Sequence, residues 1–261
     1  MAAISPSHPR LDLTDRVIIV TGGAKGIGKV YSEKLAAANA RVVIADIDQG
    51  PNDELAEAII ASGGEAISQP TDISSQTSTQ DMAAAAVAKW GRIDGLVNNA
   101  SLMSVLGRKP WFEIPPEEWD RVMTVNLRGL FLSCLAVYPQ MKAQGAGKIV
   151  NIASNRVFDG TPNRLHYTTS KAGVVGFTRA LAREVGGDNI TVNAVSPGLT
   201  LSETQIATTS NAYAGAVLDT KALKRPQVPD DLVGAVMFLL SDASNFMTGQ
   251  TMNVDGGQMM H

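Results

Sequence analysis

The feature that most constrains this chain is a regular alternation of short apolar runs with longer helical patterns. Runs such as 16–21 (RVIIVT) and 41–46 (RVVIAD) have the length and the unbroken hydrophobicity of strands that are buried on both faces. Strands are predicted at 16–21, 41–46, 67–72, 93–98, 148–153, 191–196 and 251–254, and helices at 27–38, 52–62, 76–90, 117–144, 165–186 and 229–241. This alternation predicts the α/β class, with a doubly wound, mostly parallel sheet of about seven strands and helices on both faces.

The length of the chain and its connections indicate one domain. A chain of 261 residues, of which 44% are hydrophobic, can bury one sizeable core, and no internal repeat or low-complexity linker divides it. We expect a flexible N-terminal tail at 1–12 and a single domain over 13–261. The irregular segment at about 198–229 is too long for a simple connection, and segments of this size in compact domains are usually lids or binding loops.

Charge and composition argue against several classes of partner. The formal net charge is -3 and no Lys/Arg run is longer than Lys224-Arg225, which disfavours a nucleic-acid or anionic-membrane surface. Residues 1–12 contain no apolar signal-peptide region, and no later stretch approaches the ~18 apolar residues of a membrane span. The single cysteine, Cys134, cannot form an internal disulfide, and its apolar neighbours favour a packed thiol in a reducing compartment. We therefore expect a cytoplasmic protein with a small-molecule partner, no nucleic acid, no membrane and no metal.

A glycine-rich loop follows the first predicted strand and opens the first predicted helix, at 21–28 (TGGAKGIG). Glycines at this place permit a tight turn and a close approach of the backbone to a pyrophosphate, and the helix N-terminus favours phosphate. The second predicted strand ends at Asp46, the acidic residue that is expected there to bind an adenosine ribose. A glycine turn without a ligand does not explain Asp46, so the pattern predicts dinucleotide binding.

A tyrosine and a lysine at i and i+4, Tyr167 and Lys171, share one face of the helix predicted at 165–186. A free phenol titrates near ~10, and a nearby cation favours its anionic form, so Lys171 is expected to lower the pKa of Tyr167. Ser154 follows the strand predicted at 148–153, at the sheet edge where α/β proteins bind ligands. Taken alone, the pair is more often a surface contact and Ser154 a strand-end cap, so the context has to decide.

With these elements together, the chain resembles the short-chain dehydrogenase/reductase family, in its single-domain branch, over nearly everything after residue 12. The family's motifs appear as the glycine loop at 21–28, Asp72-Ile73 after the third strand, Asn98-Asn99-Ala100-Ser101 after the fourth, Asn126, Ser154, Tyr167, Lys171 and Pro197-Gly198. One departure is Ser101, where the family usually has glycine. A serine there would carry strain if the position needs a positive φ.

The resemblance implies a Rossmann-type fold and a hydride-transfer mechanism. Tyr167 would exchange a proton with the substrate oxygen, Ser154 would orient that oxygen, and Lys171 would hold the nicotinamide ribose. Asn126 would position a water that links Lys171 to solvent, although it could instead be a helix-kink residue. The implied cofactor contacts are Gly22, Lys25, Gly26, Ile27, Gly28, Asp46, Ile47, Asp72, Ile73, Asn98, Asn99, Ala100, Tyr167, Lys171, Pro197, Gly198, Leu199 and Thr200.

Two residues point to different cofactors. Lys25 occupies a place where NADP-preferring relatives often carry a basic residue, whereas Asp46 would accept hydrogen bonds from the ribose hydroxyls of NAD and repel a 2′-phosphate. The carboxylate meets the ribose directly, while a lysine on a flexible stem can swing into solvent. We therefore expect NAD.

The substrate is less well defined by the sequence. By family analogy the pocket draws on 103–111, 155–158, Leu165, Leu199 and the substrate loop at 198–229, with Met103, Asn155, Arg156, Phe158, Leu165 and Leu199 as candidate pocket residues. Their mixture suits a compact aryl or alicyclic secondary alcohol or ketone, and Arg156 either pairs with a substrate anion or, more commonly for an arginine, faces solvent.

Local stretches resemble different activities of the family. The stretch from 225 to the C-terminus resembles bacterial dehydrogenases for secondary alcohols such as 1-phenylethanol, whereas 153–155, 160–163 and 98–101 resemble pyridoxal 4-dehydrogenases. A 3-oxoacyl thioester reductase is a third possibility. A non-catalytic NAD-binding scaffold or sensor comes from another class, but it has no need of the four candidate catalytic residues together.

Family members are usually tetramers, so a homotetramer is expected. Small residues on the helix predicted at 165–186, namely Ala172, Gly173, Gly176 and Ala180, would let a partner helix approach closely, although close packing inside the monomer explains them equally well. The C-terminal residues 259–261 are expected at a subunit contact.

Overall fold

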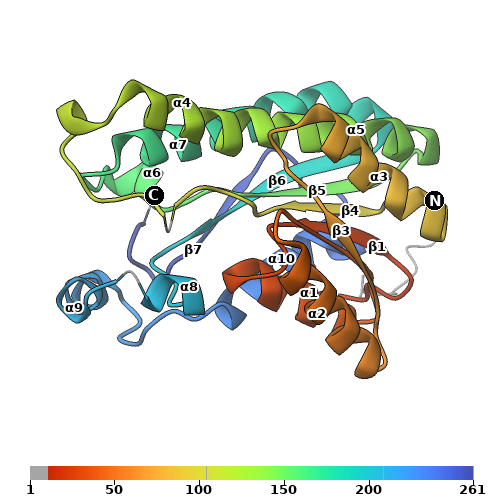
Figure 1. Ribbon diagram of the computed structural model, residues 1–261, viewed down its shortest axis with the longest axis horizontal. Coiled ribbons are helices and arrows are strands. Elements are labelled where there is room, and N and C mark those ends of the chain that lie inside the picture. Colours follow the sequence, from red (N-terminus) through yellow and green to blue (C-terminus); the bar gives the residue numbers. More distant parts are fainter. Residues whose placement is uncertain (1–10, 104, 208, 261) are drawn as a thin grey trace, which may run out of the picture.

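The computed structural model describes residues 11–103, 105–207 and 209–260, and in these residues seven parallel strands form one sheet in the order β3-β2-β1-β4-β5-β6-β7 (Figure 1). The strands are β1 (Val17–Thr21), β2 (Arg41–Asp46), β3 (Glu65–Pro70), β4 (Gly95–Asn98), β5 (Gly147–Ile152), β6 (Ile190–Pro197) and β7 (Thr251–Val254). The helices are α1 (Gly26–Ala37), α2 (Gln49–Ala61), α3 (Gln76–Trp90), α4 (Pro116–Met123), α5 (Gly129–Gln144), α6 (Arg156–Asp159), α7 (Leu165–Val185), α8 (Glu203–Ile206), α9 (Asn211–Thr220) and α10 (Asp230–Leu240). The predicted fold class is confirmed.

Helices cover both faces of the sheet, and the strand side chains alternate between them. Figure 1 shows α1, α2 and α10 on one face and α3, α4, α5 and α7 on the other. In β1, Ile18 and Val20 pack with α1 and α10, whereas Val17 and Ile19 pack with α3, α5 and α7. Both sides of a central strand are therefore apolar, which is why its sequence reads as an unbroken hydrophobic run.

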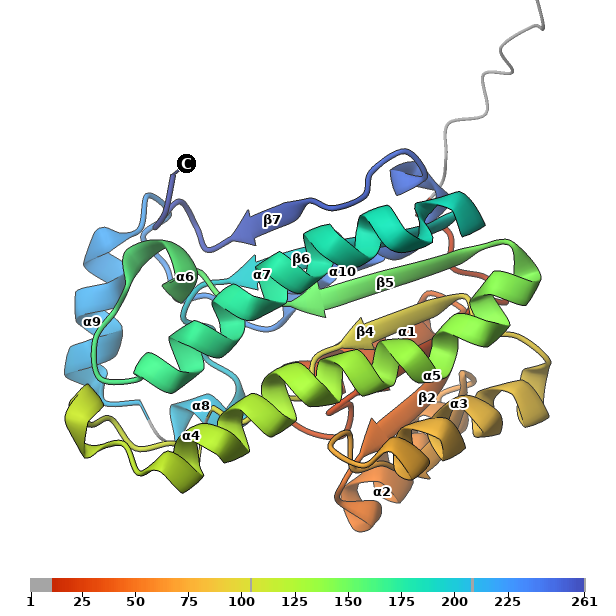
Figure 2. The same cartoon turned by 90° about the horizontal axis from the view of Figure 1, so that it is seen from above.

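The carboxyl ends of the strands gather at one edge of the molecule, where α6, α8 and α9 also lie (Figure 2). β1 sits between β2 and β4, so the strand order reverses there. In open α/β sheets, ligands bind in the crevice at such a reversal. The fold thus places the loops after β1, β4, β5 and β6 around one site.

The predicted strand limits are least accurate for β3 and β4. β3 runs over Glu65–Pro70 where 67–72 was predicted, because this edge strand pairs with β2 from Arg41 onward. β4 begins at Gly95, two residues later than predicted. The predicted tail at 1–12 falls mostly on residues 1–10, which are not among the described residues, whereas Leu13 is fully buried.

The helix predicted at 117–144 is one continuous helical stretch in three parts. α4 and α5 are joined by a π-helical segment at Thr124–Arg128 that contains Asn126. By length and composition alone, residues 116–144 would suffice to cross a membrane, contrary to our expectation that no stretch comes near this length. Here Cys134, Val137 and Met141 of this stretch pack into the core beneath the sheet, which accounts for its apolar character.

The segment at 198–229 is not irregular throughout, as the sequence suggested. It contains α8 and α9, and each helix begins at a serine whose side chain accepts a hydrogen bond from a backbone N–H, Ser202 from Gln205 and Ser210 from Tyr213. These side-chain caps satisfy N–H groups that a helix start leaves without partners.

Candidate active site

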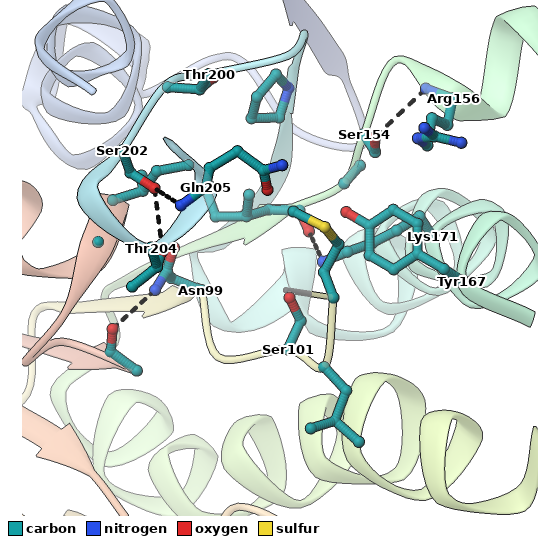
Figure 3. Close-up of a pocket in the computed structure, with 18 of the residues that line it drawn as sticks. Asn99, Ser101, Ser154, Arg156, Tyr167, Lys171, Thr200, Ser202, Thr204 and Gln205 are labelled. Carbon is teal, nitrogen blue, oxygen red and sulfur yellow. Dashed lines mark hydrogen bonds between the residues drawn. The ribbon is translucent and has the colours of Figure 1, made fainter. Parts of the chain in front are cut away.

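A cavity of about 440 Å³ opens at the carboxyl ends of the strands (Figure 3). Most of the predicted site residues line it: Gly22, Lys25, Gly26, Ile27, Asp46, Ile47, Asp72, Ile73, Asn99, Ala100, Met103, Ser154, Asn155, Arg156, Tyr167, Lys171, Pro197, Gly198, Leu199 and Thr200. Phe158 and Leu165 lie outside the lining and are 39% and 47% exposed. Gly28, Asn98 and Asn126 also lie outside it and support the cavity wall.

The glycine loop after β1 forms one wall through close backbone packing. Gly22 and Gly26 have φ values of +61° and +56°, a region that disfavours other residues. A Cβ atom at Gly22 would lie 2.8 Å from the Ala100 Cα atom, and one at Gly28 would overlap the Gly22 carbonyl group. The loop therefore presents bare backbone to the cavity at the N-terminus of α1, where phosphate groups bind favourably.

The residues present fit a dinucleotide. Gly26 N–H at the start of α1 donates to Glu203 Oε1 at 3.1 Å, so this N–H already holds an anionic group. Asp46 lies at the end of β2, and its Oδ2 atom accepts from Ala24 N–H at 3.2 Å. Glycine loop, helix N-terminus and Asp46 thus line one continuous cavity with the candidate catalytic residues.

Lys25 is paired within the site. Its Nζ atom lies 2.6 Å from Asp48 Oδ2, and the hydrogen bond with Asp48 raises the pKa of the lysine. The Asp48 N–H in turn donates to Asp46 Oδ1 at 3.3 Å. The positive charge of Lys25 is therefore balanced by the neighbouring carboxylate of Asp48.

The motif after β4 joins three parts of the site. Asn99 Nδ2 donates to the carbonyl oxygens of Thr21 and Gly22 at 3.1 and 3.0 Å, which fixes the glycine loop. Asn98 is buried and donates to Asn151 Oδ1 on β5 at 2.9 Å, so it acts here as a bridge between strands. Ser101, the departure from the family pattern, is not among the residues with positive φ, so the strain that the sequence suggested does not arise.

Tyr167 and Lys171 project from α7 into the cavity, and Ser154 follows β5 beside them (Figure 3). Lys171 Nζ donates to the carbonyl oxygen of Ile152 at 2.7 Å and lies 5.8 Å from the centre of the Tyr167 ring. Both side chains are buried, with 7% of Tyr167 and 4% of Lys171 exposed. The helix thus delivers the pair to the end of the strand that carries Ser154.

Burial governs the acid–base properties of this pair. It raises the pKa of Tyr167, while a hydrogen bond with Ser154 and the positive charges of Arg156 and Arg164 act to lower it. Burial also lowers the pKa of Lys171 to about 8. In this arrangement the ammonium group of Lys171 is directed to a backbone carbonyl, and the cations that lower the pKa of Tyr167 are arginines. That Lys171 also lowers this pKa stays a prediction.

Asn126 links the π-helical segment to two other elements. Its Oδ1 atom accepts from Leu102 N–H at 2.8 Å, and its Nδ2 atom donates to Ser170 Oγ at 3.0 Å and to the Leu102 carbonyl at 3.2 Å. Asn98, Asn126 and Lys171 also line a separate cavity of about 10 Å³, which is close to the space that one water needs. Asn98 Oδ1 in that lining has no partner among the described residues.

Arg156, a predicted pocket residue, lies in the lining, is half-buried and donates to Tyr213 Oη at 3.0 Å, which favours the pocket over the solvent-facing alternative. Other cavity residues were not predicted. Arg164 and Gln258 also line the cavity, and Asn155 Nδ2 donates to Gln258 Oε1 at 3.0 Å. Nothing in the sequence singles out these two residues, because only the folded chain brings them to the site.

The chain is similar to known proteins over nearly its whole length. A family model described as Enoyl-(Acyl carrier protein) reductase matches residues 22–259. The chain is 40% identical over 255 residues to "Probable galactose dehydrogenase GalD" of Rhizobium meliloti (strain 1021), covering 97% of this chain and 98% of that protein. It is 38% identical over 253 residues to a 3-oxoacyl-(acyl-carrier-protein) reductase of Synechocystis sp., covering 95% and 98%. A crystal structure of a "putative short-chain alcohol dehydrogenase" from Sinorhizobium meliloti 1021 superposes with a TM-score of 0.88 at 32% identity, covering 96% and 98%.

Proposed function

Because the chain belongs to the short-chain dehydrogenase/reductase family of oxidoreductases, we propose that it transfers a hydride between NAD(H) and a small secondary alcohol or ketone. The observation that carries this proposal is that Ser154, Tyr167 and Lys171 line the same cavity as the glycine loop and Asp46. A scaffold or sensor that only binds a dinucleotide has no use for the first three.

The proposed roles follow from what each side chain contacts. A bound nicotinamide supplies or accepts the hydride. Tyr167 Oη exchanges the proton with the substrate oxygen, and Ser154 hydrogen-bonds the same oxygen and orients it. Lys171, with a pKa of about 8, is still largely charged at neutral pH, and its proposed role is to hold the nicotinamide ribose. Asn126 holds the loop after β4 against α7 and lines the small cavity that would take a proton-relaying water.

NAD is the cofactor that we propose over NADP. Asp46 lines the adenosine end, and the cation that would attract a 2′-phosphate, Lys25, is already paired with Asp48. A 2′-phosphate there would meet the carboxylates of both Asp46 and Asp48.

The substrate that we propose is an aryl or alicyclic secondary alcohol or ketone. Met103, Leu199 and Val217 supply apolar lining, which suits a ring. The relative named as a galactose dehydrogenase favours a cyclic alcohol, and the one named as a 3-oxoacyl reductase favours the alternative of an oxoacyl thioester. A pyridoxal 4-dehydrogenase-like activity stands as a further alternative. We also propose a cytoplasmic homotetramer without a nucleic-acid or membrane partner.

A substrate panel followed by cofactor absorbance tests the function. The panel contains 1-phenylethanol, alicyclic alcohols and their ketones, galactose, pyridoxal and 3-oxoacyl thioesters, each with NAD(H) and NADP(H). Tyr167→Phe should keep the fold and the NAD(H) affinity but reduce turnover at least ~10²-fold, as expected for a general acid/base group. A variant with near-normal kcat would exclude Tyr167 as the acid/base, and cofactor binding without any turnover would favour a scaffold.

A further inference from the structure

Three arginines meet at the substrate end of the cavity. Arg108 comes from the loop after β4, Arg156 from α6 and Arg164 from the residue before α7, and all three line the cavity. Among the ion pairs formed by the described residues, none includes any of the three. The acidic residue nearest in sequence, Asp159, directs its carboxylate to the N–H and hydroxyl of Thr161.

Tyr213 of α9 holds two of these arginines together. The Arg108 Cζ atom lies 3.6 Å from the centre of the Tyr213 ring, and Arg156 Nη2 donates to the hydroxyl of the same residue at 3.0 Å. One aromatic side chain therefore carries one guanidinium on its face and another at its hydroxyl end. Stacking of this kind fixes an arginine without neutralising its charge.

Arg164 is the buried member of the cluster. It is only 5% exposed, its Nη2 atom donates to the Leu106 carbonyl oxygen at 3.0 Å, and its Nε atom has no partner among the described residues. Burial, and to a smaller extent the charges of Arg108 and Arg156, lower the pKa of Arg164. A purely structural role explains the bonds of Arg164 to Leu106 and Met103 but not its lack of a carboxylate partner, since a buried charge is normally paired. Arg156 is half-buried and Arg108 is exposed, so both can reach a ligand in the cavity.

Building on the proposed function, we infer that the alcohol or ketone substrate carries a carboxylate, which Arg108, Arg156 and Arg164 bind while Tyr167 acts on the oxygen at the reacting carbon. Arginine presents planar, two-pronged donors that match the two oxygens of a carboxylate. The nitrogens without hydrogen bonds to described residues are those of Arg108 and the Nε atoms of Arg156 and Arg164, and these donors can serve two carboxylate oxygens. Arg156, Arg164 and Tyr167 line the same cavity, so the anion site and the reacting oxygen share one space.

A matched series of alcohols tests this inference. 4-(1-Hydroxyethyl)benzoate, its methyl ester, 1-phenylethanol and the corresponding phosphonate differ chiefly in the group that faces the arginines. Wild-type kcat/KM for the carboxylate should exceed that for the ester by about tenfold or more, the scale of one charge-assisted hydrogen bond. Arg108→Gln and Arg156→Gln should each reduce this preference about tenfold, whereas Arg179→Gln, an exposed arginine on α7 outside the cavity lining, should leave it unchanged.

The possible results distinguish a failure of the carboxylate site from a failure of the proposed dehydrogenase activity. Equal kcat/KM for the carboxylate and the ester, or a preference that both cavity variants retain, would overturn the carboxylate site while leaving the dehydrogenase intact. A preference for the phosphonate over the carboxylate would also overturn it, in favour of a phosphate-bearing substrate. Absence of turnover for the whole series and for every other alcohol in the panel would instead overturn the proposed function.

Discussion

The spacing of Tyr167 and Lys171 in the sequence predicts some properties of this pair but not others. The i, i+4 spacing correctly predicts that both side chains emerge on one face of α7, and both line the cavity. It does not predict that Lys171 Nζ turns to the Ile152 carbonyl or that burial moves both pKa values. Those properties depend on β5 and on the charges of two arginines, which the local sequence does not contain.

At the adenosine end, Asp46 is the residue that we expect to decide between cofactors. Asp46→Ala should raise the ratio of kcat/KM for NADP to that for NAD at least tenfold, or ~1.4 kcal/mol, because the carboxylate that repels a 2′-phosphate is gone. A second variant, Asp48→Ala, tests the contribution of Lys25. It removes the ion-pair partner of Lys25 and leaves Asp46 in place, and it should also favour NADP. A wild-type enzyme that uses both cofactors equally would contradict the assignment to NAD.

Among the elements, α8 lies against the glycine loop and places Glu203 on Gly26 N–H. A pyrophosphate bound at the start of α1 would compete with this carboxylate and be repelled by it. Glu203→Gln should therefore strengthen NAD(H) binding several-fold in a calorimetric titration. Glu57→Gln, an exposed change on α2, is the control and should leave the Kd unchanged. Weaker binding by the Glu203 variant would mean that the carboxylate assists the cofactor.

The two helices missed in 198–229 show which signals were overlooked. Residues 202–205 (SETQ) match the pattern of a helix start with serine first and glutamine three residues later, and Ser202 does cap α8. α9 also has a serine cap, at Ser210, but its hydrophobic pattern is weak because only Val217 is buried. α8 could thus have been predicted from its cap, whereas the position of α9 over the cavity depends on contacts such as that of Tyr213 with Arg156.

The N-terminus of α10 is stabilised by an ion pair that responds to acid. Arg225 donates two hydrogen bonds to Asp231, at 2.7 and 2.6 Å, and lowers the pKa of this carboxyl group to about 2. Since the unfolded chain binds this proton near 3.8, the contribution to stability is complete above that pH and is lost as the pH falls through about 2. Asp231→Asn should therefore lower the Tm at pH 7, and the difference from wild type should shrink as the pH approaches 2.

Asp230 provides the matched control for this measurement. It lies at the same helix terminus and pairs with Lys34 at 2.9 Å, but its side chain is 59% exposed. Exposed pairs contribute little to stability, so Asp230→Asn should change the Tm less than Asp231→Asn. If both substitutions lower the Tm equally at pH 7, the Arg225–Asp231 pair contributes no more to stability than the exposed Lys34–Asp230 pair.

For the molecule as a whole, the sheet and its two helical layers could be predicted because each central strand is a continuous apolar run and each helix lies between two such runs. The grouping of Gly22, Gly26 and Asp46 along one cavity could be predicted as well, since these residues belong to one local strand-loop-helix-strand unit. The arginine cluster could not. Arg108, Arg156 and Arg164 come from separate segments, and only the packed molecule, with Tyr213 between two of them, brings their charges together.

The assembly prediction rests on the outer surface of α7. Gly173 packs inside the chain, where an added Cβ would lie 2.8 Å from Leu127, so close packing within the monomer explains this residue. Ala172, Gly176 and Ala180 are exposed, and nothing lies within 4 Å of a Cβ built at Gly176. Met260 is also exposed, and His261 lies outside the described residues, so the C-terminal contact stays a prediction.

Light scattering at micromolar concentration should show a homotetramer. Gly176→Leu should reduce the assembly without unfolding the chain, because the added side chain has room in the monomer but would obstruct a partner helix. Gly50→Leu, which also enters open space but on α2, is the control. A wild-type protein that remains monomeric would contradict the prediction.

α7 carries the proposed chemistry on one side and the proposed subunit contact on the other. Lys171 and Ala172 are neighbours in sequence, yet one is buried in the cavity wall and the other is exposed. A helix moves largely as a rigid body, so loosening its outer side also loosens the groups on its inner side. Specific activity should therefore fall on dilution as the subunits separate, and enzyme immobilised at low density should lose turnover before it loses its fold.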